Sequence, residues 1–115
     1  MKIIIAGSRE FDNYELLKEK VDYYTQNKSH VEIVSGCARG ADKLGEKYAK
    51  ERGWQIHEFP AEWKRYGKKA GMIRNQKMVE FADGLICFWN GESRGAKDVI
   101  NRAEKAGIKV RVVHF

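Results

Sequence analysis

The chain begins with the stretch Lys2-Ile3-Ile4-Ile5-Ala6-Gly7-Ser8-Arg9, in which an uninterrupted apolar run leads into a small, polar turn. A run without polar interruptions is typical of a strand that is covered on both faces, as in a parallel sheet between two layers of helices. Similar runs follow at intervals that leave room for a helix between them, over Val31–Val34, Trp54–Phe59, Leu85–Trp89 and Ile108–Val113. The last run alternates apolar and polar residues, which predicts a strand at the edge of the sheet.

The segments between these runs carry apolar residues at helical spacing. One face of each predicted helix is formed by Tyr14, Leu17, Val21 and Tyr24, by Ala41, Leu44, Gly45, Tyr48 and Ala49, by Met78 and Phe81, and by Ala96, Val99, Ile100 and Ala103. Asp12 or Asn13 is suited to cap the first helix, and Gly53 and Gly107 to end two others. The alternation predicts one α/β domain over residues 1–115, a Rossmann-like three-layer sandwich with a five-stranded, mainly parallel sheet and helices on both faces.

The chain of 115 residues is 43% hydrophobic, which is enough to form a core. Its formal net charge of +6 arises from 22 Lys and Arg against 16 Asp and Glu. The basic excess is concentrated between residues 64 and 77, a stretch without acids that contains Lys64, Arg65, Lys68, Lys69, Arg74 and Lys77. Such a run indicates either a site for a phosphate-bearing partner or a solvated face of a loop and helix.

No apolar run approaches the roughly 20 residues that a membrane span needs. Met1 and Lys2 lead directly into a predicted strand, so we expect a cytoplasmic protein without a cleaved leader or a membrane partner. The two cysteines, Cys37 and Cys87, are too few for a disulfide framework and lie at no metal-ligand spacing. We therefore expect no metal site and no cofactor.

Four connections follow the predicted strands and should meet at one edge of the sheet, because parallel strands all end at the same edge. They are Gly7-Ser8-Arg9, the segment from Ser35 to Asp42, the segment from Pro60 to Gly71 with Trp63, and the segment from Asn90 to Ala96. The Pro60–Gly71 connection is longer than the usual two to six residues, and long connections are often functional. The sequence predicts that a ligand binds at this edge.

Two of these connections have the features of a phosphate-binding turn. Gly36 and Gly40 bracket the turn into one helix, and Gly91 and Gly95 precede another, so backbone N–H groups at each helix start could approach an anion. Both pairs of glycines could instead permit a tight turn and nothing more. Arginine suits bidentate phosphate contacts, and we expect about half of four arginines near strand ends to touch ligand: Arg9, Arg39, Arg74 and Arg94.

Other side chains at this edge suit the ribose and the base of a nucleotide. Ser8, Ser35 and Asp42 could bond a ribose, although serine is also common in turns and Asp42 would favour a helix start. Trp63 or Tyr66 could stack a base beside Lys68. Cys37 is predicted to be a small turn residue rather than a nucleophile, because no histidine follows in its loop.

Taken together, these motifs resemble the SLOG superfamily, and most closely its small YspA-like, YpsA-related branch. The resemblance rests on Gly7-Ser8-Arg9 with Phe11 and Asp12, on Ser35-Gly36-x-Ala38-Arg39-Gly40-Ala41-Asp42, on Trp63-Lys64-x-Tyr66-Gly67 with Ala70-Gly71-x-x-Arg74-Asn75-x-x-Met78, and on Asn90-Gly91-x-Ser93-x-Gly95-Ala96. It covers nearly the whole chain, implies the Rossmann-like fold and fits a bacterial or phage source.

The LOG enzymes of this superfamily are phosphoribohydrolases that cleave nucleoside 5′-monophosphates into base and ribose 5-phosphate. Arg74-Asn75-x-x-Met78 looks like the helix start of these enzymes, with Arg74 matching their catalytic arginine. Their second motif ends in a catalytic Glu, where this chain has Val99, with Asp98 one residue earlier. A shift of one residue turns a side chain by about 100° around a helix, so Asp98 is an imperfect replacement.

The leading functional prediction is binding of a nucleotide or ADP-ribose-like ligand, for sensing or sequestration, as in non-enzymatic SLOG domains. The alternatives are a phosphoribohydrolase that uses Arg74 with Asp98 or Glu92, and single-stranded nucleic-acid binding as in the DprA branch. The resemblance also suggests a homodimer or larger homo-oligomer. The predicted ligand-binding set is Gly7, Ser8, Arg9, Ser35, Gly36, Arg39, Gly40, Asp42, Trp63, Tyr66, Lys68, Arg74, Asn75, Asn90, Gly91, Ser93 and Gly95.

Overall fold

The computed structural model describes all residues 1–115 and contains five strands alternating with helices. In chain order the elements are β1 (Lys2–Gly7), α1 (Tyr14–Thr25), β2 (Glu32–Ser35), α2 (Ala41–Arg52), β3 (Ile56–Glu58), α3 (Trp63–Tyr66), the 3₁₀ turn η1 (Gly67–Lys69), α4 (Ala70–Phe81), β4 (Gly84–Trp89), α5 (Arg94–Ala106) and β5 (Lys109–His114).

The strands form one sheet in the order β3-β2-β1-β4-β5, and every neighbouring pair is parallel. The predicted five-stranded Rossmann-like sheet is therefore confirmed. β5 lies at one edge, as its alternating sequence predicted, while the almost wholly apolar β1 lies at the centre. Ile4 and Ile5 at the middle of β1 are fully buried, because helices cover both faces of the sheet.

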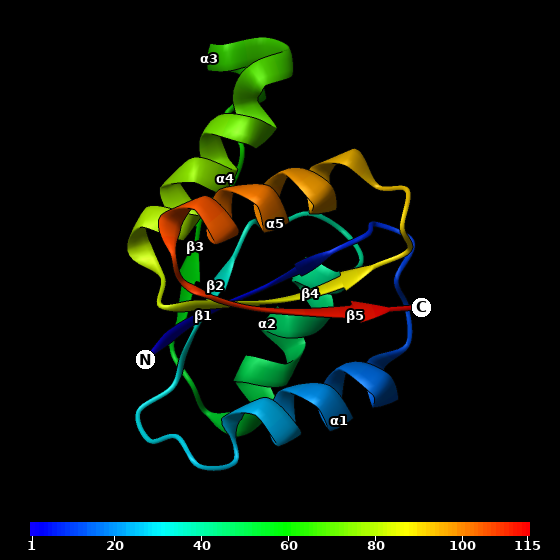
Figure 1. The fold of residues 1–115 in the computed structure, drawn as a ribbon, viewed down its shortest axis with the longest axis vertical. Helices are drawn as coiled ribbons and strands as arrows, with labels where there is room; N and C mark the ends of the chain where they lie inside the picture. The colour runs from blue at the N-terminus through cyan, green and yellow to red at the C-terminus, as the bar shows by residue number, and fades with distance from the viewer.

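The helices pack in two layers, with α1 and α2 below the sheet and α4 and α5 above it in the view of Figure 1. Successive side chains of a strand point to opposite faces, so β1 contributes to two separate cores. Ile3 and Ile5 pack with Leu17, Val21 and Tyr48 on the α1–α2 side. On the α4–α5 side, Ile4 and Ala6 belong to a cluster with Val34, Met78, Leu85, Val99 and Ile100.

The helix ends follow the predicted chemistry. Of the two candidates at the first helix, Asn13 is the cap, and its Oδ1 accepts from the Leu16 N–H at 3.0 Å. Gly53 and Gly107 end α2 and α5 in the left-handed conformation, with φ of 72° and 75°.

Two expectations are wrong. Phe81 was expected in the core but is 37% exposed, because it lies at the end of α4 and packs on His57 and Phe59 beside the edge strand β3. β3 is also shorter than the apolar run that predicted it, since Trp54 lies outside the strand and packs edge-on against Tyr48.

The long connection after β3 is ordered as α3 and η1, and it projects from the top of the molecule in Figure 1 ahead of α4. No residue from Trp63 to Lys69 is fully buried. No helix in the structure combines the length and apolar character required to cross a membrane.

Candidate functional site

The site lies where the chain changes direction within the sheet. From the central strand β1 the chain passes to β2 on one side and later to β4 on the other, and the helices that follow β1 and β4 cover opposite faces of the sheet. Ligands of open α/β sheets bind at such a switch point. A cavity of about 470 Å³, here called the crevice, opens at this point. Ten residues of the predicted ligand-binding set line the crevice: Gly7, Ser8, Arg9, Arg39, Asp42, Arg74, Asn75, Asn90, Ser93 and Gly95.

Ser8 joins three of the connections that form the crevice. Its carbonyl accepts from the N–H groups of Phe11 at 3.1 Å and Ala41 at 3.4 Å, and its hydroxyl oxygen accepts from the Asn90 N–H at 3.2 Å. Because one residue holds both neighbouring loops, the walls of the crevice are fixed relative to each other.

The loop after β2 approaches the rest of the site closely, which explains two of its glycines. A Cβ atom at Gly40 would lie 2.5 Å from the Ser8 carbonyl oxygen, and the φ of 82° there also favours glycine. A Cβ atom at Gly36 would lie 2.7 Å from Arg74 Nη1 and 2.8 Å from Asp42 Oδ2. Gly36 therefore leaves room for a cation and a carboxylate on either side of it.

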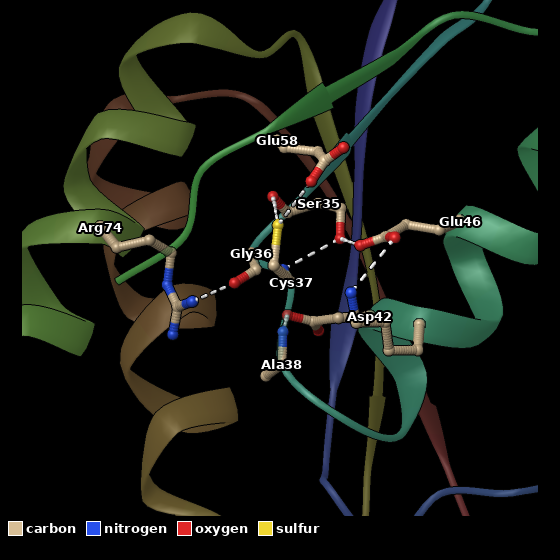
Figure 2. Close-up of polar contacts among 9 residues, drawn as sticks. Ser35, Gly36, Cys37, Ala38, Asp42, Glu46, Glu58 and Arg74 are labelled. Carbon is tan, nitrogen blue, oxygen red and sulfur yellow. Dashed lines mark hydrogen bonds and ion pairs between the residues drawn. The ribbon is translucent and has the colours of Figure 1, made fainter. Parts of the chain in front are cut away.

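Arg74 reaches from α4 to this loop (Figure 2). Its Nη1 donates to the Gly36 carbonyl at 2.6 Å, and its Nε donates to Asn75 Oδ1 at 2.9 Å. Burial lowers the pKa of Arg74, although the nearby Asp42 carboxylate partly offsets this effect. The guanidinium is held in a defined orientation at the wall of the crevice.

Asp42 is only 5% exposed and still lines the crevice. Its Oδ2 accepts from the Ala38 N–H at 3.2 Å. Burial raises the pKa of Asp42 to about 6, against the opposing effects of this hydrogen bond and of Arg74. The crevice thus contains a carboxyl group that takes up a proton under mildly acidic conditions.

Arg9 and Arg39 complete the cationic part of the site. Both are exposed, both line the crevice, and neither guanidinium has a hydrogen-bonded or ion-paired partner in the protein. At the start of α5, Ser93 caps the helix and its hydroxyl accepts from the Ala96 N–H, while the N–H groups of Arg94 and Gly95 have no acceptor. These groups are available to an anion.

A second cavity of about 430 Å³, here called the outer hollow, adjoins the crevice. The two share Arg9, Ala38, Arg39 and Arg74. The outer hollow also contains Gly36, Cys37, Pro60 and Ala61, together with Trp63, which is 51% exposed. Trp63 therefore lines the same cavity as Arg9, Arg39 and Arg74.

Several predicted residues lie elsewhere. Ser35 is fully buried, donates to Glu46 at 2.6 Å and accepts from the Cys37 N–H (Figure 2). Its side chain therefore anchors the loop after β2 and lines neither cavity. Tyr66 lines a separate hollow and lies between Arg65 and Lys77. Three further predicted residues line neither the crevice nor the outer hollow: Gly40, Lys68 and Gly91. Arg94 is exposed outside both cavities.

Asp98 lies between α4 and α5 rather than in the crevice. Its Oδ2 accepts from Asn75 Nδ2 and from Arg102 Nε, each at 2.9 Å. Asn75 in turn accepts from Arg74. Asp98 thus orients Asn75, which orients Arg74, and it presents no carboxylate to a molecule in the crevice.

Cys37 occupies the turn with a φ of 64°, and its thiol lies 3.6 Å from Glu58 Oε2. Burial and the neighbouring Glu46 carboxylate raise the pKa of Cys37, so the reactive thiolate is disfavoured. No group of three or more His, Cys, Asp or Glu side chains is arranged to hold a metal ion.

Three residues that were not predicted for the site also line the crevice: Glu10, Met78 and Val99. Glu10 directly follows the predicted Gly7-Ser8-Arg9 motif, which is the signal that could have identified it. Met78 and Val99 belong to the core and reach the floor of the crevice from α4 and α5.

A parallel α/β sheet with a crevice at its switch point defines a Rossmann-like protein. The chain belongs, more specifically, to the YspA, cpYpsA-related SLOG family (YAcAr), whose family model matches residues 1–66. The predicted SLOG resemblance is thereby confirmed. Membership supports a function related to nucleotides or nucleic acids in general.

Two individual proteins are similar to this chain. Gene 61 protein of Mycobacterium phage D29 is 33% identical over 116 residues, which cover 95% of this chain and 93% of the phage protein. A phage relative fits the expected bacterial or phage source. The solved structure of DNA processing protein A (DprA) from Streptococcus pneumoniae has the same fold, with a TM-score of 0.76 and 22% identity over 96% of this chain. The match covers 49% of the DprA chain, so this chain spans about half the length of DprA.

Proposed function

We propose that this protein binds a nucleotide or an ADP-ribose-like ligand in the crevice, as a sensor of that ligand or to sequester it. The observation that carries the proposal is the set of three arginines at the switch point, of which Arg9 and Arg39 have no partner within the protein. Unpaired guanidinium groups beside a cavity of about 470 Å³ suit a phosphate-bearing small molecule.

Each part of such a ligand has a matching group. Arg9, Arg39 and the remaining nitrogen of Arg74 are placed to bind phosphate, together with the free N–H groups at the start of α5. Asn90 and Ser93 border the crevice where ribose hydroxyls would lie. The Trp63 ring offers a surface on which a base can stack.

Native mass spectrometry of the protein as purified from cells, followed by calorimetric titration with nucleoside monophosphates, ADP and ADP-ribose, tests this proposal. We expect micromolar binding that weakens about ten-fold or more in Arg39→Ala, because a charge-assisted contact is lost. Arg111→Ala, which removes an arginine from β5 near the opposite end of the sheet, is the matched control. Equal effects of the two variants, or no binding at all, would exclude the crevice as the binding site.

A second candidate function is hydrolysis of the N-glycosidic bond of a nucleoside 5′-monophosphate. Asp42 favours it, since a buried carboxyl with a pKa of about 6 beside Arg74 is suited to donate a proton to a departing base. Chromatography would then detect free base and ribose 5-phosphate. Asp42→Asn should abolish turnover, whereas Asp98→Asn should retain most of it, since Asp98 acts only by positioning Asn75.

A third candidate is binding of single-stranded nucleic acid, which the projecting α3–η1 segment favours. It exposes Trp63 beside Lys64, Arg65, Lys68 and Lys69. The affinity for an oligonucleotide would fall steeply with rising salt, because several phosphates would be neutralised, whereas a mononucleotide would show a shallow dependence.

The homodimer or larger homo-oligomer suggested by the resemblance stays a prediction, which light scattering would test.

A further inference from the structure

The crevice is lined by ionisable groups of both signs in equal number. Its three arginines and three carboxyl groups are Arg9, Arg39, Arg74, Glu10, Asp42 and Glu92. With all six ionised, the formal charges of the lining cancel. A phosphate that enters is attracted by the arginines and repelled by the carboxylates, so the state of the carboxyl groups determines how tightly it binds.

The three carboxyl groups differ in burial. Glu10 and Glu92 are exposed, so water and salt screen their charges and their side chains are free to turn away from a ligand. Asp42 is buried at the start of α2, and its Oδ2 is held by the Ala38 N–H. Asp42 is therefore the one carboxyl group that stays beside a bound phosphate.

The second oxygen of Asp42 is open to the crevice. Oδ1 has no hydrogen-bond partner in the protein, and the structure contains no completely buried side-chain oxygen or nitrogen without a partner. Because Asp42 lines the crevice, Oδ1 is the oxygen that a ligand meets. A carboxylate oxygen only accepts hydrogen bonds, whereas the O–H of a protonated acid donates to a phosphate oxygen.

The groups around Asp42 place its proton equilibrium near neutral pH. Burial raises the pKa of Asp42 to about 6, against the charges of Arg74 on α4 and Arg9 after β1, while Glu46 on α2 adds to the rise. On β4, burial and Asp42 raise the pKa of Cys87 to about 12, so this thiol supplies no charge. A phosphate held by Arg74 and Arg9 adds a negative charge beside the Asp42 carboxyl and raises the pKa of Asp42 further.

We propose that Asp42 takes up a proton when a phosphate-bearing ligand enters the crevice, so that the protein binds its ligand more tightly as the pH falls. The proton comes from the solvent, resides on Oδ1 in the complex and returns to the solvent when the ligand leaves. In the complex the Oδ1–H donates to a phosphate oxygen, and Oδ2 still accepts from the Ala38 N–H. This inference rests on the proposed function and adds how pH regulates the same site.

Calorimetric titration with ADP-ribose between pH 5.5 and 8.5 tests the inference, because the pyrophosphate of this probe keeps the same charge over that range. The methyl ester of adenosine 5′-monophosphate, whose phosphodiester also keeps one charge, is the second probe. We expect Kd to fall about ten-fold or more from pH 8 to pH 6, and to level off below pH 6, where the free protein already holds the proton. At pH 7, two buffers of different ionisation enthalpy should reveal uptake of roughly half a proton per ligand.

The sign of the pH dependence is decisive. Affinity that is independent of pH overturns the inference. Affinity that rises with pH also overturns it, because Asp42 would then act as a carboxylate that accepts from a hydroxyl group of the ligand.

Asp42→Asn imitates the protonated acid, since a neutral amide N–H replaces the Oδ1–H. This variant should bind ADP-ribose about five-fold or more tighter than the unmodified protein at pH 8, and its Kd should change by no more than about two-fold between pH 8 and pH 6. Asp83→Asn makes the same change at an exposed carboxylate outside both cavities, and this control should keep the full pH dependence.

The histidines provide an internal check. They lie outside both cavities and are present in both variants: His30, His57 and His114. A pH dependence that persists in Asp42→Asn would therefore arise from other groups and would overturn the inference.

The outcomes distinguish failure of the inference from failure of the proposed function. If either probe binds in an Arg39-dependent manner without proton uptake, the proposed function stands and the inference is wrong. If neither probe binds at any pH, both are wrong.

Discussion

Arg74 Nη1 donates to the carbonyl of Gly36 at 2.6 Å, which joins two residues that are 38 positions apart in the sequence. The bond connects α4 to the loop after β2 and fixes the guanidinium beside Asp42. Because Gly36 lies between Arg74 and Asp42, the smallest side chain at position 36 would displace one of them. The geometry of the site thus depends on the absence of a single carbon atom.

Gly36→Ala should lower ligand affinity by about ten-fold or more, because the new methyl group would displace a charge-assisted contact. The φ at Gly36 is not positive, so the effect would be steric rather than a backbone penalty. Titration calorimetry would measure it. The control is Gly84→Ala, where the added carbon would meet no atom closer than 3.5 Å. Unchanged affinity in Gly36→Ala would show that the ligand does not use Arg74 or Asp42.

Asp42→Asn should stabilise the fold in a pH-dependent way. The pKa of Asp42 is raised from 3.8 to about 6 in the folded protein, so the folded state holds the proton more tightly than the unfolded state does. The resulting penalty is absent below pH 4, grows between pH 4 and 6, and reaches about 3 kcal/mol at most above pH 7. Asparagine does not ionise and avoids this penalty.

Urea denaturation at pH 4.5 and 7.5 would measure this difference in the free energy of unfolding. We expect the gain of Asp42→Asn over the unmodified protein to be larger at pH 7.5. Asp83→Asn, which changes an exposed carboxylate, serves as the control. A gain of the same size at both pH values would contradict the raised pKa.

The triple variant Lys64→Ala/Lys68→Ala/Lys69→Ala should keep the affinity for a small nucleotide within about two-fold, because exposed charges at a distance are screened by salt. All three lysines are exposed, and none lines the crevice or the outer hollow. Binding of single-stranded nucleic acid should weaken in this variant, and fluorescence anisotropy with a labelled oligonucleotide would measure that loss. A parallel loss of nucleotide affinity would mean that the α3–η1 segment folds over the site.

Comparing Gly40→Ala with Gly53→Ala separates the cost of a positive φ from the cost of a steric clash. Gly53 has a φ of 72° with no atom near its missing side chain, so alanine should cost about 1–2 kcal/mol of stability. Gly40 has a similar φ of 82° but lies against the Ser8 and Arg9 carbonyls, so alanine should cost about 3 kcal/mol or more. Thermal unfolding of both variants would measure the difference. Equal losses would mean that the loop yields to the added carbon.

The sequence was sufficient to predict the alternation of strands and helices along the chain, because β1, β2 and β4 are nearly uninterrupted apolar runs and α1, α2 and α5 have a predicted cap at Asn13, Gly53 and Gly107. The prediction that Phe81 is buried was wrong because Phe81 and Met78 are three residues apart, a spacing that places both on one face of a helix. Phe81 lies at the end of α4 beside the short strand β3, where its ring is left at the surface. The α3–η1 segment has no apolar period, so its projection from the body could not be read from the sequence.

The sequence predicted the candidate site only in part. Residues directly after strands, such as Arg9 and Asn90, lie at the crevice because topology alone places them there. Asp98 and Ser35 have the right residue types at nearby positions, yet their side chains point to Asn75 and Glu46. The direction of a side chain depends on its packing, which spacing along the chain does not determine.

The walls of the crevice come from four segments that are spread between Ala6 and Val99. None of these segments forms a binding surface by itself, so an unfolded or half-folded chain offers a ligand nothing to hold. Occupancy must then favour the complete fold, by about 2.7 kcal/mol at a ligand concentration one hundred times the dissociation constant. A rise in the thermal unfolding temperature can therefore show that a mixture of metabolites contains a ligand, before any affinity is measured.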